Sequence, residues 1–216
     1  SGYSIENVSQ VQDKDGEWRP IDSDKDPTVI LLHYQSILED TINYIPPRVK
    51  IEISCLSMDE PTELRQIRSL IGESFDGEDT DTESLVRTVV PTRTFLEKLF
   101  LLAEEFQKEK PRSVRMSRHL YDLEKLMDTE YGKEALSNRE LYDAIVEHRK
   151  AYYALKYVNY DLHSPSTISF TIPESVIEAW QDDYADMRRF FIYGESLEFD
   201  ALMQRIKKLQ KRVKMM

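Results

Sequence analysis

The 216-residue sequence is poor in cysteine and glycine, and it contains no long apolar run. Its single cysteine, Cys55, excludes an intramolecular disulfide framework and a paired-cysteine metal site, and it fits a reducing compartment such as the cytoplasm. The six glycines form no Gly-Gly or Gly-Ser step, and the sequence has no P-loop, dinucleotide-binding glycine motif or nucleophile elbow. No apolar run approaches the ~20 residues of a membrane span, so we expect no membrane partner.

Positive charge is also scarce, because 29 Lys and Arg residues face 40 Asp and Glu residues, for a net charge of -11. This balance argues against broad, sequence-independent binding of nucleic acid, since the phosphates would be repelled. The acids concentrate in residues 73–83, whereas the bases cluster in residues 108–118 and 205–214. A local site for an anionic ligand is therefore still compatible with the composition. The length suits one large domain or two small ones.

Strand-forming patterns dominate the first part of the sequence. Residues 1–27 are polar and rich in turn formers, so they are expected to form loops with at most one short hairpin. Residues 28–37 carry β-branched and large apolar groups, which predicts a strand. Three further strands are expected at residues 48–55, 64–72 and 84–90.

Residues 48–55 alternate strictly between apolar and polar side chains. The apolar face ends at Cys55, whose thiol we expect to be buried, and the polar face presents Lys50 and Glu52. A lysine and an acid on one open strand face suit a site for a metal ion and a phosphate. The same pair is typical of any half-exposed antiparallel strand, which is the simpler interpretation of the pattern alone.

The pattern becomes helical from Pro91 onward, and this change is the best candidate for a domain boundary. Apolar residues recur at three- and four-residue steps in five segments, about 93–106, 119–127, 137–159, 173–194 and 196–213. Ser137 and Glu140 have capping-box spacing, and Ser196 is placed to cap the last helix. His148 is expected at the edge of the core, since no second His or Cys lies at ligand spacing. The last helix ends in a cluster of cations. They are as consistent with stabilisation of the helix dipole as with contact to RNA.

The segment Pro91–Met127 is expected to form two helices joined by a basic loop. Their apolar stripes, which we expect to share one core, are formed by Phe95, Leu99, Leu102, Leu123 and Leu126. Lys98, Arg118 and Asp122 lie beside these stripes, where they are able to converge on a phosphate-bearing ligand. At positions i and i+4, however, Arg118 and Asp122 more often form a solvated salt bridge.

Two segments of this helix pair carry a resemblance to a known family. Arg93–Lys98 (RTFLEK), followed by Arg118–Leu123 (RHLYDL), resembles the paired signature of the AbiEii/AbiGii-type nucleotidyltransferase toxins. Upstream, Pro47–Ser54 and the later Glu60-Pro61 are similar to the family's third-carboxylate strand and its continuation. Downstream, Asp183–Met187 (DYADM) resembles a late helix of the family. The resemblance covers residue 28 to the C-terminus, the later two-thirds of the family's pattern.

The resemblance implies an α+β fold and a set of site residues. Residues 1–91 would be the remnant of a nucleotidyltransferase-type mixed sheet, and residues 92–216 a helical C-terminal domain. Glu52 would be the third acid and a metal ligand, and Lys98 the phosphate-binding lysine. Asp122 would be the late catalytic aspartate, with Lys50 and Arg118 assisting nucleotide binding. The implied reaction transfers a nucleotide from an NTP, with Mg²⁺, to an acceptor such as tRNA. The implied setting is the cytoplasm, as the toxin of a toxin–antitoxin or phage-defence pair with a cognate antitoxin.

The glycine motif and the apolar-flanked Asp-x-Asp strand of this family are absent from the sequence. Asp22-Ser23-Asp24 spells Asp-x-Asp, but its flanks carry turn formers, so we expect a loop. The chain begins at Ser1 without an initiator methionine, and we expect a segment to precede it. This chain alone is therefore expected to be inactive and to bind neither Mg²⁺ nor NTP. A second hypothesis is a non-catalytic interaction module that keeps the fold without the metal site.

Overall fold

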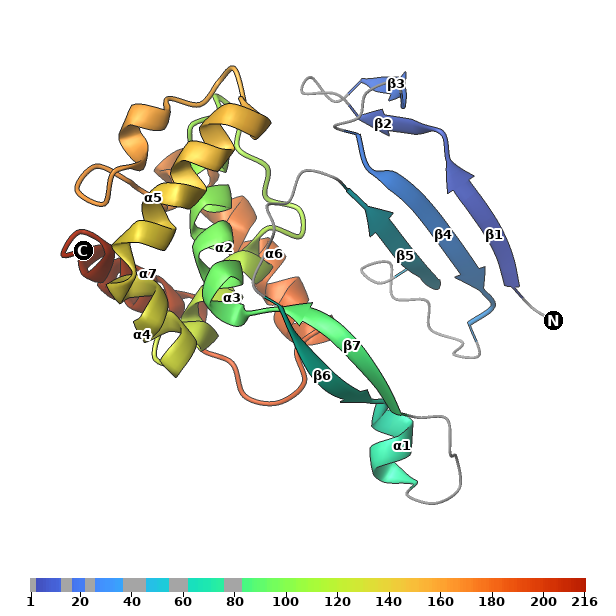
Figure 1. The fold of residues 1–216 in the computed structure, drawn as a ribbon. Coiled ribbons are helices and arrows are strands. Elements are labelled where there is room, and N and C mark those ends of the chain that lie inside the picture. The colour runs from blue at the N-terminus through green and yellow to red at the C-terminus, as the bar shows by residue number, and fades with distance from the viewer. Residues whose placement is uncertain (1–2, 13–16, 22–25, 37–45, 55–61, 76–82) are drawn as a thin grey trace.

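The structure is a computed structural model, and it describes residues 3–12, 17–21, 26–36, 46–54, 62–75 and 83–216. Strands precede Pro91 and helices follow it, apart from the short helix α1 (Leu70–Ser74) (Figure 1). The expected α+β fold is confirmed. Asp22-Ser23-Asp24, Cys55 and Glu60-Pro61 lie outside the described residues.

The described strands form three antiparallel sheets instead of the expected mixed one. The largest has the order β1-β4-β5 and is built from β1 (Tyr3–Val8), β4 (Thr28–Tyr34) and β5 (Arg48–Ile53). A small hairpin pairs β2 (Gln10–Gln12) with β3 (Trp18–Pro20). A longer hairpin pairs β6 (Thr62–Arg68) with β7 (Glu83–Val89) and carries α1 at its tip (Figure 1).

Two expectations about the strands were wrong. Residues 1–27 contain three strands, where loops with at most one hairpin were expected. The sequence did not indicate β1 because this strand forms by pairing with β4, which is distant in sequence. Residues 64–72 are not one strand, since β6 ends at Arg68 and α1 begins at Leu70. The hydroxyl of Ser69 accepts a hydrogen bond from the Gly72 backbone N–H and caps this helix, a signal that competes with strand extension.

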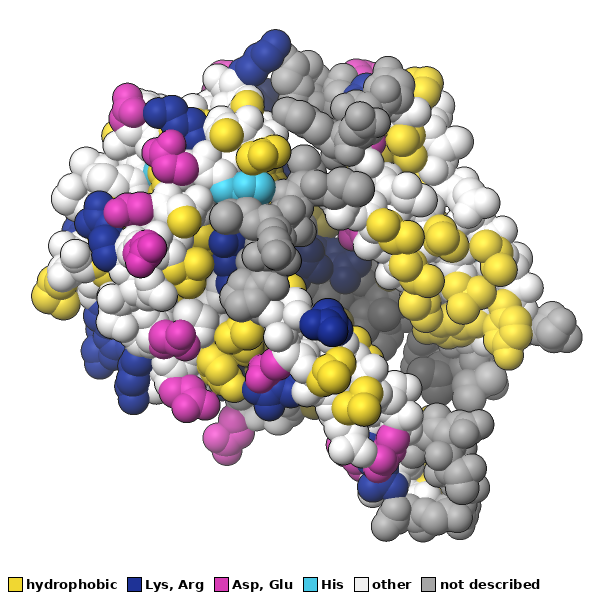
Figure 2. Space-filling view, viewed as in Figure 1, with side chains coloured by type: hydrophobic (Ala, Val, Ile, Leu, Met, Phe, Trp, Pro, Cys, Tyr) yellow, Lys and Arg dark blue, Asp and Glu magenta, His cyan; other side chains and the backbone are white. Residues whose placement is uncertain are grey.

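The faces of the three-stranded sheet follow from its register, because directly opposed residues point to the same side. Val29 pairs with Glu52 and Leu31 with Lys50, so both polar residues lie on the face of β4 that is buried. The other face is apolar and open among the described residues (Figure 2), with exposed side chains from Tyr3, Ile5, Tyr34, Val49, Ile51 and Ile53. The apolar side of β5, expected to be buried as far as Cys55, is therefore the exposed one.

The rest of the chain is mostly helical. The longer helices are α2 (Pro91–Glu105), α3 (Ser117–Leu126), α4 (Glu130–Ser137), α5 (Arg139–His148), α6 (Ile177–Phe190) and α7 (Phe199–Val213). A π-helical turn, η1 (Arg149–Tyr153), continues α5, and 3-10 turns occur at η2 (Tyr160–His163) and η3 (Glu174–Val176). None of the helices in the described part of the chain combines the length and apolar composition needed to cross a bilayer.

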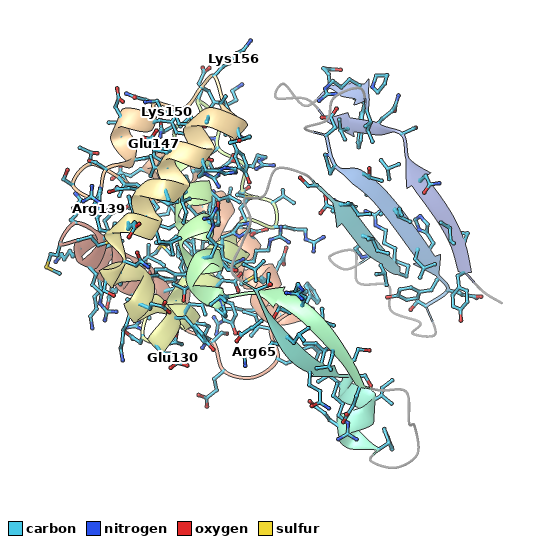
Figure 3. The ribbon with its side chains drawn as sticks, viewed as in Figure 1. Arg65, Glu130, Arg139, Glu147, Lys150 and Lys156 are labelled. Atoms are coloured by element: carbon cyan, nitrogen blue, oxygen red, sulfur yellow. The ribbon has the colours of Figure 1, made fainter. Side chains whose placement is uncertain are left out.

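The core lies in this part of the chain, and all its buried members come from residues 95–213. Most are on helices, and Ile168, Phe170 and Ile172 come from the segment between η2 and η3. Phe95, Leu99, Leu102 and Leu123 are fully buried in it, and Leu126 packs against it partly buried, so the predicted shared core is confirmed. The hairpin β6–β7 joins this body through its direct continuation into α2. It is also held by Arg65, whose Nη2 donates to the Tyr131 hydroxyl at 2.9 Å (Figure 3).

Several helix boundaries differ from those expected. Helix α4 was not anticipated, and its last residue is Ser137, whose hydroxyl donates to the Glu134 carbonyl instead of capping α5. Asn138 caps α5, and the helical run ends at Tyr153 because Ala154 turns into the left-handed region with φ 46°. The last helix begins after Glu198, not Ser196. Short polar side chains compete for the cap position, and packing selects among them.

Candidate functional site

Lys98 and Asp122 form an ion pair between two helices. Lys98 projects from α2, Asp122 projects from α3, and Nζ lies 2.7 Å from Oδ2. Among the described residues Asp122 pairs with this lysine and not with Arg118, so the expected i, i+4 salt bridge is absent. Both side chains are partly exposed, at 23% and 36%, and the pair is open to a ligand.

Two neighbouring cavities meet at this ion pair. The first, of about 420 Å³, is bounded by α2, α3 and the end of α6 and is lined by Lys98, Arg118, His119 and Asp122, among others. The second, of about 380 Å³, is lined by Arg93, Thr94, Glu97, Lys98, His119, His148, Arg149 and Tyr153 with two apolar residues, Val89 and Leu101. Because Lys98 and His119 border both, the two cavities are adjoining parts of one concave surface. The expected place of His148 at the edge of the core is confirmed, since it is 9% exposed.

The wall of the second cavity is a buried charge network. The Arg149 guanidinium donates to both carboxylate oxygens of Glu104, with Nε 2.7 Å from Oε1, and also pairs with Glu97. Arg93 donates to Glu97 at 2.8 Å. Burial alone would raise the pKa of Glu104, but the hydrogen bonds and charges of Arg149 and His163 together outweigh it and hold that pKa below its ordinary value. The network fixes α5 and its π-turn against α2 and so defines this side of the site.

The basic loop before α3 is held by acids of the protein itself. Glu105 accepts hydrogen bonds from Lys108 at 2.9 Å and from the Arg112 backbone N–H at 2.8 Å. Burial would raise the pKa of Glu105, yet the bonds from Arg112 and Lys108 lower it. Part of the predicted cationic patch is therefore neutralised within the fold, whereas Arg118 lines the first cavity.

Asp183 orients the start of α3 from the neighbouring helix α6. Its carboxylate accepts hydrogen bonds from the Ser117 backbone N–H at 3.0 Å, from the Ser117 hydroxyl and from the Arg115 backbone N–H. Arg115 adopts φ 58°, an uncommon value for a non-glycine residue. Helix α3 has no side-chain cap of its own, so Asp183 supplies it and fixes the direction in which Arg118 and His119 project. The DYADM resemblance marked Asp183 without indicating this role.

Lys50 and Glu52 lie elsewhere. They pair with each other at 2.8 Å and line a separate cavity of about 600 Å³ between the three-stranded sheet and the β2–β3 hairpin. The structure thus brings Lys98, Arg118 and Asp122 together but places Glu52 at another cavity. In the space-filling view, Lys and Arg side chains are visible in the hollow between the helices and this sheet (Figure 2).

The described residues do not by themselves fit a Mg²⁺ ion. Mg²⁺ requires near-octahedral coordination by six oxygens, usually from one or two carboxylates together with water and substrate phosphates. Glu52 is a single carboxylate already paired with Lys50, and in the described ranges no three His, Cys, Asp or Glu side chains gather. We therefore derive no step through the metal.

Sequence reasoning missed three residues of this surface, His119, Arg149 and Arg93. Arg93 and His119 stood within the recognised motifs, but nothing in their spacing indicated that they border a cavity. Arg149 follows an amphipathic helix as an ordinary cation would, and its burial depends on Glu104, 45 residues away. Only the helix packing reveals that partner.

Cationic side chains from two helices, set around one aspartate at a concave surface, are typical of proteins that bind phosphate-bearing ligands. A family model described as "Nucleotidyl transferase AbiEii toxin, Type IV TA system" matches residues 4–205, so this chain belongs to the AbiEii nucleotidyltransferase toxin family. The resemblance seen in the sequence is thereby confirmed. No curated protein and no solved structure matches the chain significantly.

Proposed function

We propose that this protein transfers a nucleotide from an NTP to an acceptor, and that the surface around Lys98 and Asp122 binds the triphosphate. The observation that carries the proposal is the 2.7 Å contact of these two side chains from different helices, at a cavity that Arg118 also lines. Convergence of charged groups from separate elements on one cavity is a better indication of a site than any single residue.

Each side chain has a role in this proposal. Lys98 provides a compact positive charge for a phosphate oxygen, and Arg118 provides a planar guanidinium that binds two oxygens at once. Asp122 keeps the flexible Lys98 side chain directed along the cavity wall and is the late aspartate of the catalytic set. Glu52 is proposed as the third acid, with Lys50 beside it, although the pair lines a separate cavity and not the one at Lys98.

The acceptor and the partner also belong to the proposal. We infer an RNA acceptor such as tRNA, a cognate antitoxin, a cytoplasmic setting and a role in phage defence. The net charge of -11 restricts RNA contact to basic segments. On α7, Arg205 and Arg212 pair with Asp128, which supports a structural role for these two. The exposed cations that remain on this helix are Lys207, Lys208 and Lys211.

The test is a transfer assay on the full-length gene product with labelled NTPs and tRNA. Lys98→Ala and Asp122→Ala should abolish transfer while changing the melting temperature by about 2 °C or less, since neither residue fills core volume. Lys150→Ala and Asp143→Ala are matched controls, because they remove the same charges from exposed positions of η1 and α5 (Figure 3). Unchanged transfer by Lys98→Ala would show that the triphosphate binds elsewhere.

A charge swap separates a structural ion pair from a functional one. The double variant Lys98→Asp with Asp122→Lys keeps opposite charges at the two positions but exchanges their places. If the pair only holds α2 to α3, the swapped protein should regain whatever the single variants lose. We expect it to stay inactive, because the carboxylate would then face the phosphates.

A non-catalytic interaction module is the second candidate. It is favoured by the separation of Glu52 from the Lys98 cavity and by the neutralisation of Lys98 by Asp122. The upstream coding sequence discriminates between the two: a glycine motif followed by an apolar-flanked Asp-x-Asp supports the enzyme. A natural start near Ser1, together with no transfer from any of the four NTPs, supports the module.

A further inference from the structure

His119 occupies the boundary between the two cavities. It lies in the first turn of α3, lines both cavities together with Lys98, and is 8% exposed. Its neighbour in sequence, Arg118, faces the first cavity. An imidazole at this place is in reach of any ligand that extends along Lys98 from one cavity to the other.

The ring of His119 has no hydrogen-bond partner among the described residues. Its Nδ1 is enclosed and unsatisfied, although burying a polar atom without a partner costs about 1 to 3 kcal/mol. Buried side-chain polar atoms in folded proteins nearly always have a partner, so an exception at a cavity calls for an explanation. Two other histidines lie in the helical half. His148 also borders the second cavity, and its ring stacks on Tyr152 at 4.6 Å. Both ring nitrogens of the fully buried His163 are likewise unsatisfied, but this ring stacks on Phe100 at 5.6 Å and lines neither of the two cavities.

The electrostatic surroundings keep this ring neutral. Burial, reinforced by the positive charges of Lys98, Arg118 and Arg112, lowers the pKa of His119 to about 4. A neutral imidazole carries one N–H donor and one acceptor nitrogen. Between cations, the donor is the useful group, because the ligand that these cations attract is an anion whose oxygens accept hydrogen bonds.

We propose that His119 donates a hydrogen bond to a phosphate group of the bound nucleotide, at the junction of the two cavities. This inference rests on the proposed function, since it concerns the same surface, and it adds a binding residue that Lys98 and Asp122 do not imply. The ligand then spans both cavities, with Lys98 and His119 as shared contacts. The donor is the Nε2–H, because Nδ1 is enclosed and out of reach of a ligand in the cavity. The bound phosphate gives this N–H the partner that the protein itself does not provide.

The test is a titration of the full-length protein, labelled at its histidine rings, with inorganic tripolyphosphate, followed by NMR. His119 resonances, assigned by their loss in His119→Gln, should shift on binding, and those of the buried His163 should not. Calorimetry should show that His119→Phe, which keeps ring volume but no hydrogen bond, binds tripolyphosphate about tenfold more weakly. His119→Gln keeps an N–H donor and should bind tripolyphosphate more tightly than His119→Phe. If His119→Phe fails to fold, His119→Leu replaces it in this comparison.

The outcomes separate this inference from the proposed function. The wild type transfers nucleotide in the first case, but the His119 resonances do not move or the variants bind tripolyphosphate as tightly as the wild type. This result overturns the inference and leaves the function standing. No transfer, with a His119 shift and weaker binding by His119→Phe, supports the binding role and overturns the enzyme. Absence of tripolyphosphate binding by the wild type overturns the inference.

Discussion

The helical half and the strand half of this protein are built differently. Residues 95–213 supply a continuous buried core, whereas the described residues before Pro91 contribute only Val29 and Leu31 as buried apolar side chains. The helices therefore hold a self-contained hydrophobic interior. The strands are held by backbone pairing, and the apolar face of the three-stranded sheet is open among the described residues.

This difference indicates where stability resides. A residue in the helical half is surrounded by packed neighbours, so its loss leaves a cavity or an unpaired charge. A residue on the open sheet face is already half in water, so its loss changes little. The ion pair of Lys98 and Asp122 stands on the packed half, which is where a site that must hold a ligand in fixed geometry is expected.

The largest effect is expected from breaking the buried charge network. Glu104→Ala leaves Arg149 buried without its main partner, and we expect a loss of about 3 to 5 kcal/mol in the free energy of unfolding. Denaturant unfolding measures it. Glu63→Ala, which removes an exposed partner of Arg65 on β6, is the matched control and should cost less than about 1 kcal/mol. Equal losses in both variants would contradict the contrast between the halves.

A smaller effect is expected from removing apolar volume in each half. Leu123→Ala, at a fully buried position, should cost about 2 to 5 kcal/mol. Ile51→Ala, at a position 47% exposed on β5, should cost about 1 kcal/mol or less, because little transfer energy is at stake. If Ile51→Ala proves as costly as Leu123→Ala, the sheet face is covered in solution.

The third effect concerns acid. The pKa of His119 is lowered to about 4 in the folded protein, against about 6.5 in the unfolded chain, so only the unfolded state binds the proton between these values. Stability should therefore fall as the pH drops from 6.5 toward 4, by about 2 kcal/mol at pH 5. The variant His119→Gln should lack this component. Parallel pH profiles for the two proteins would show that the imidazole is not held neutral.

Much of the fold was predictable from local pattern. The change from strands to helices at Pro91, the strands β4 and β5, and the shared stripe of α2 and α3 all follow from side-chain periodicity. Periodicity did not reveal β1 to β3, whose polar sequences become strands only through pairing, or α4, whose weak stripe is short. It also did not decide which face of β5 is buried, since alternation specifies two faces without ranking them.

For the site, the sequence by itself determined the family, the candidate residues Lys98, Arg118 and Asp122, and the helices that carry them. Tertiary structure decided the rest. It paired Asp122 with Lys98 instead of Arg118, set Glu52 and Lys50 on a different cavity, and placed His119 between two cavities with an unsatisfied nitrogen. The physical reason is that ion pairs and cavities between helices depend on the angle and register of packing. Those are fixed by contacts between residues far apart in the chain, which local sequence does not encode.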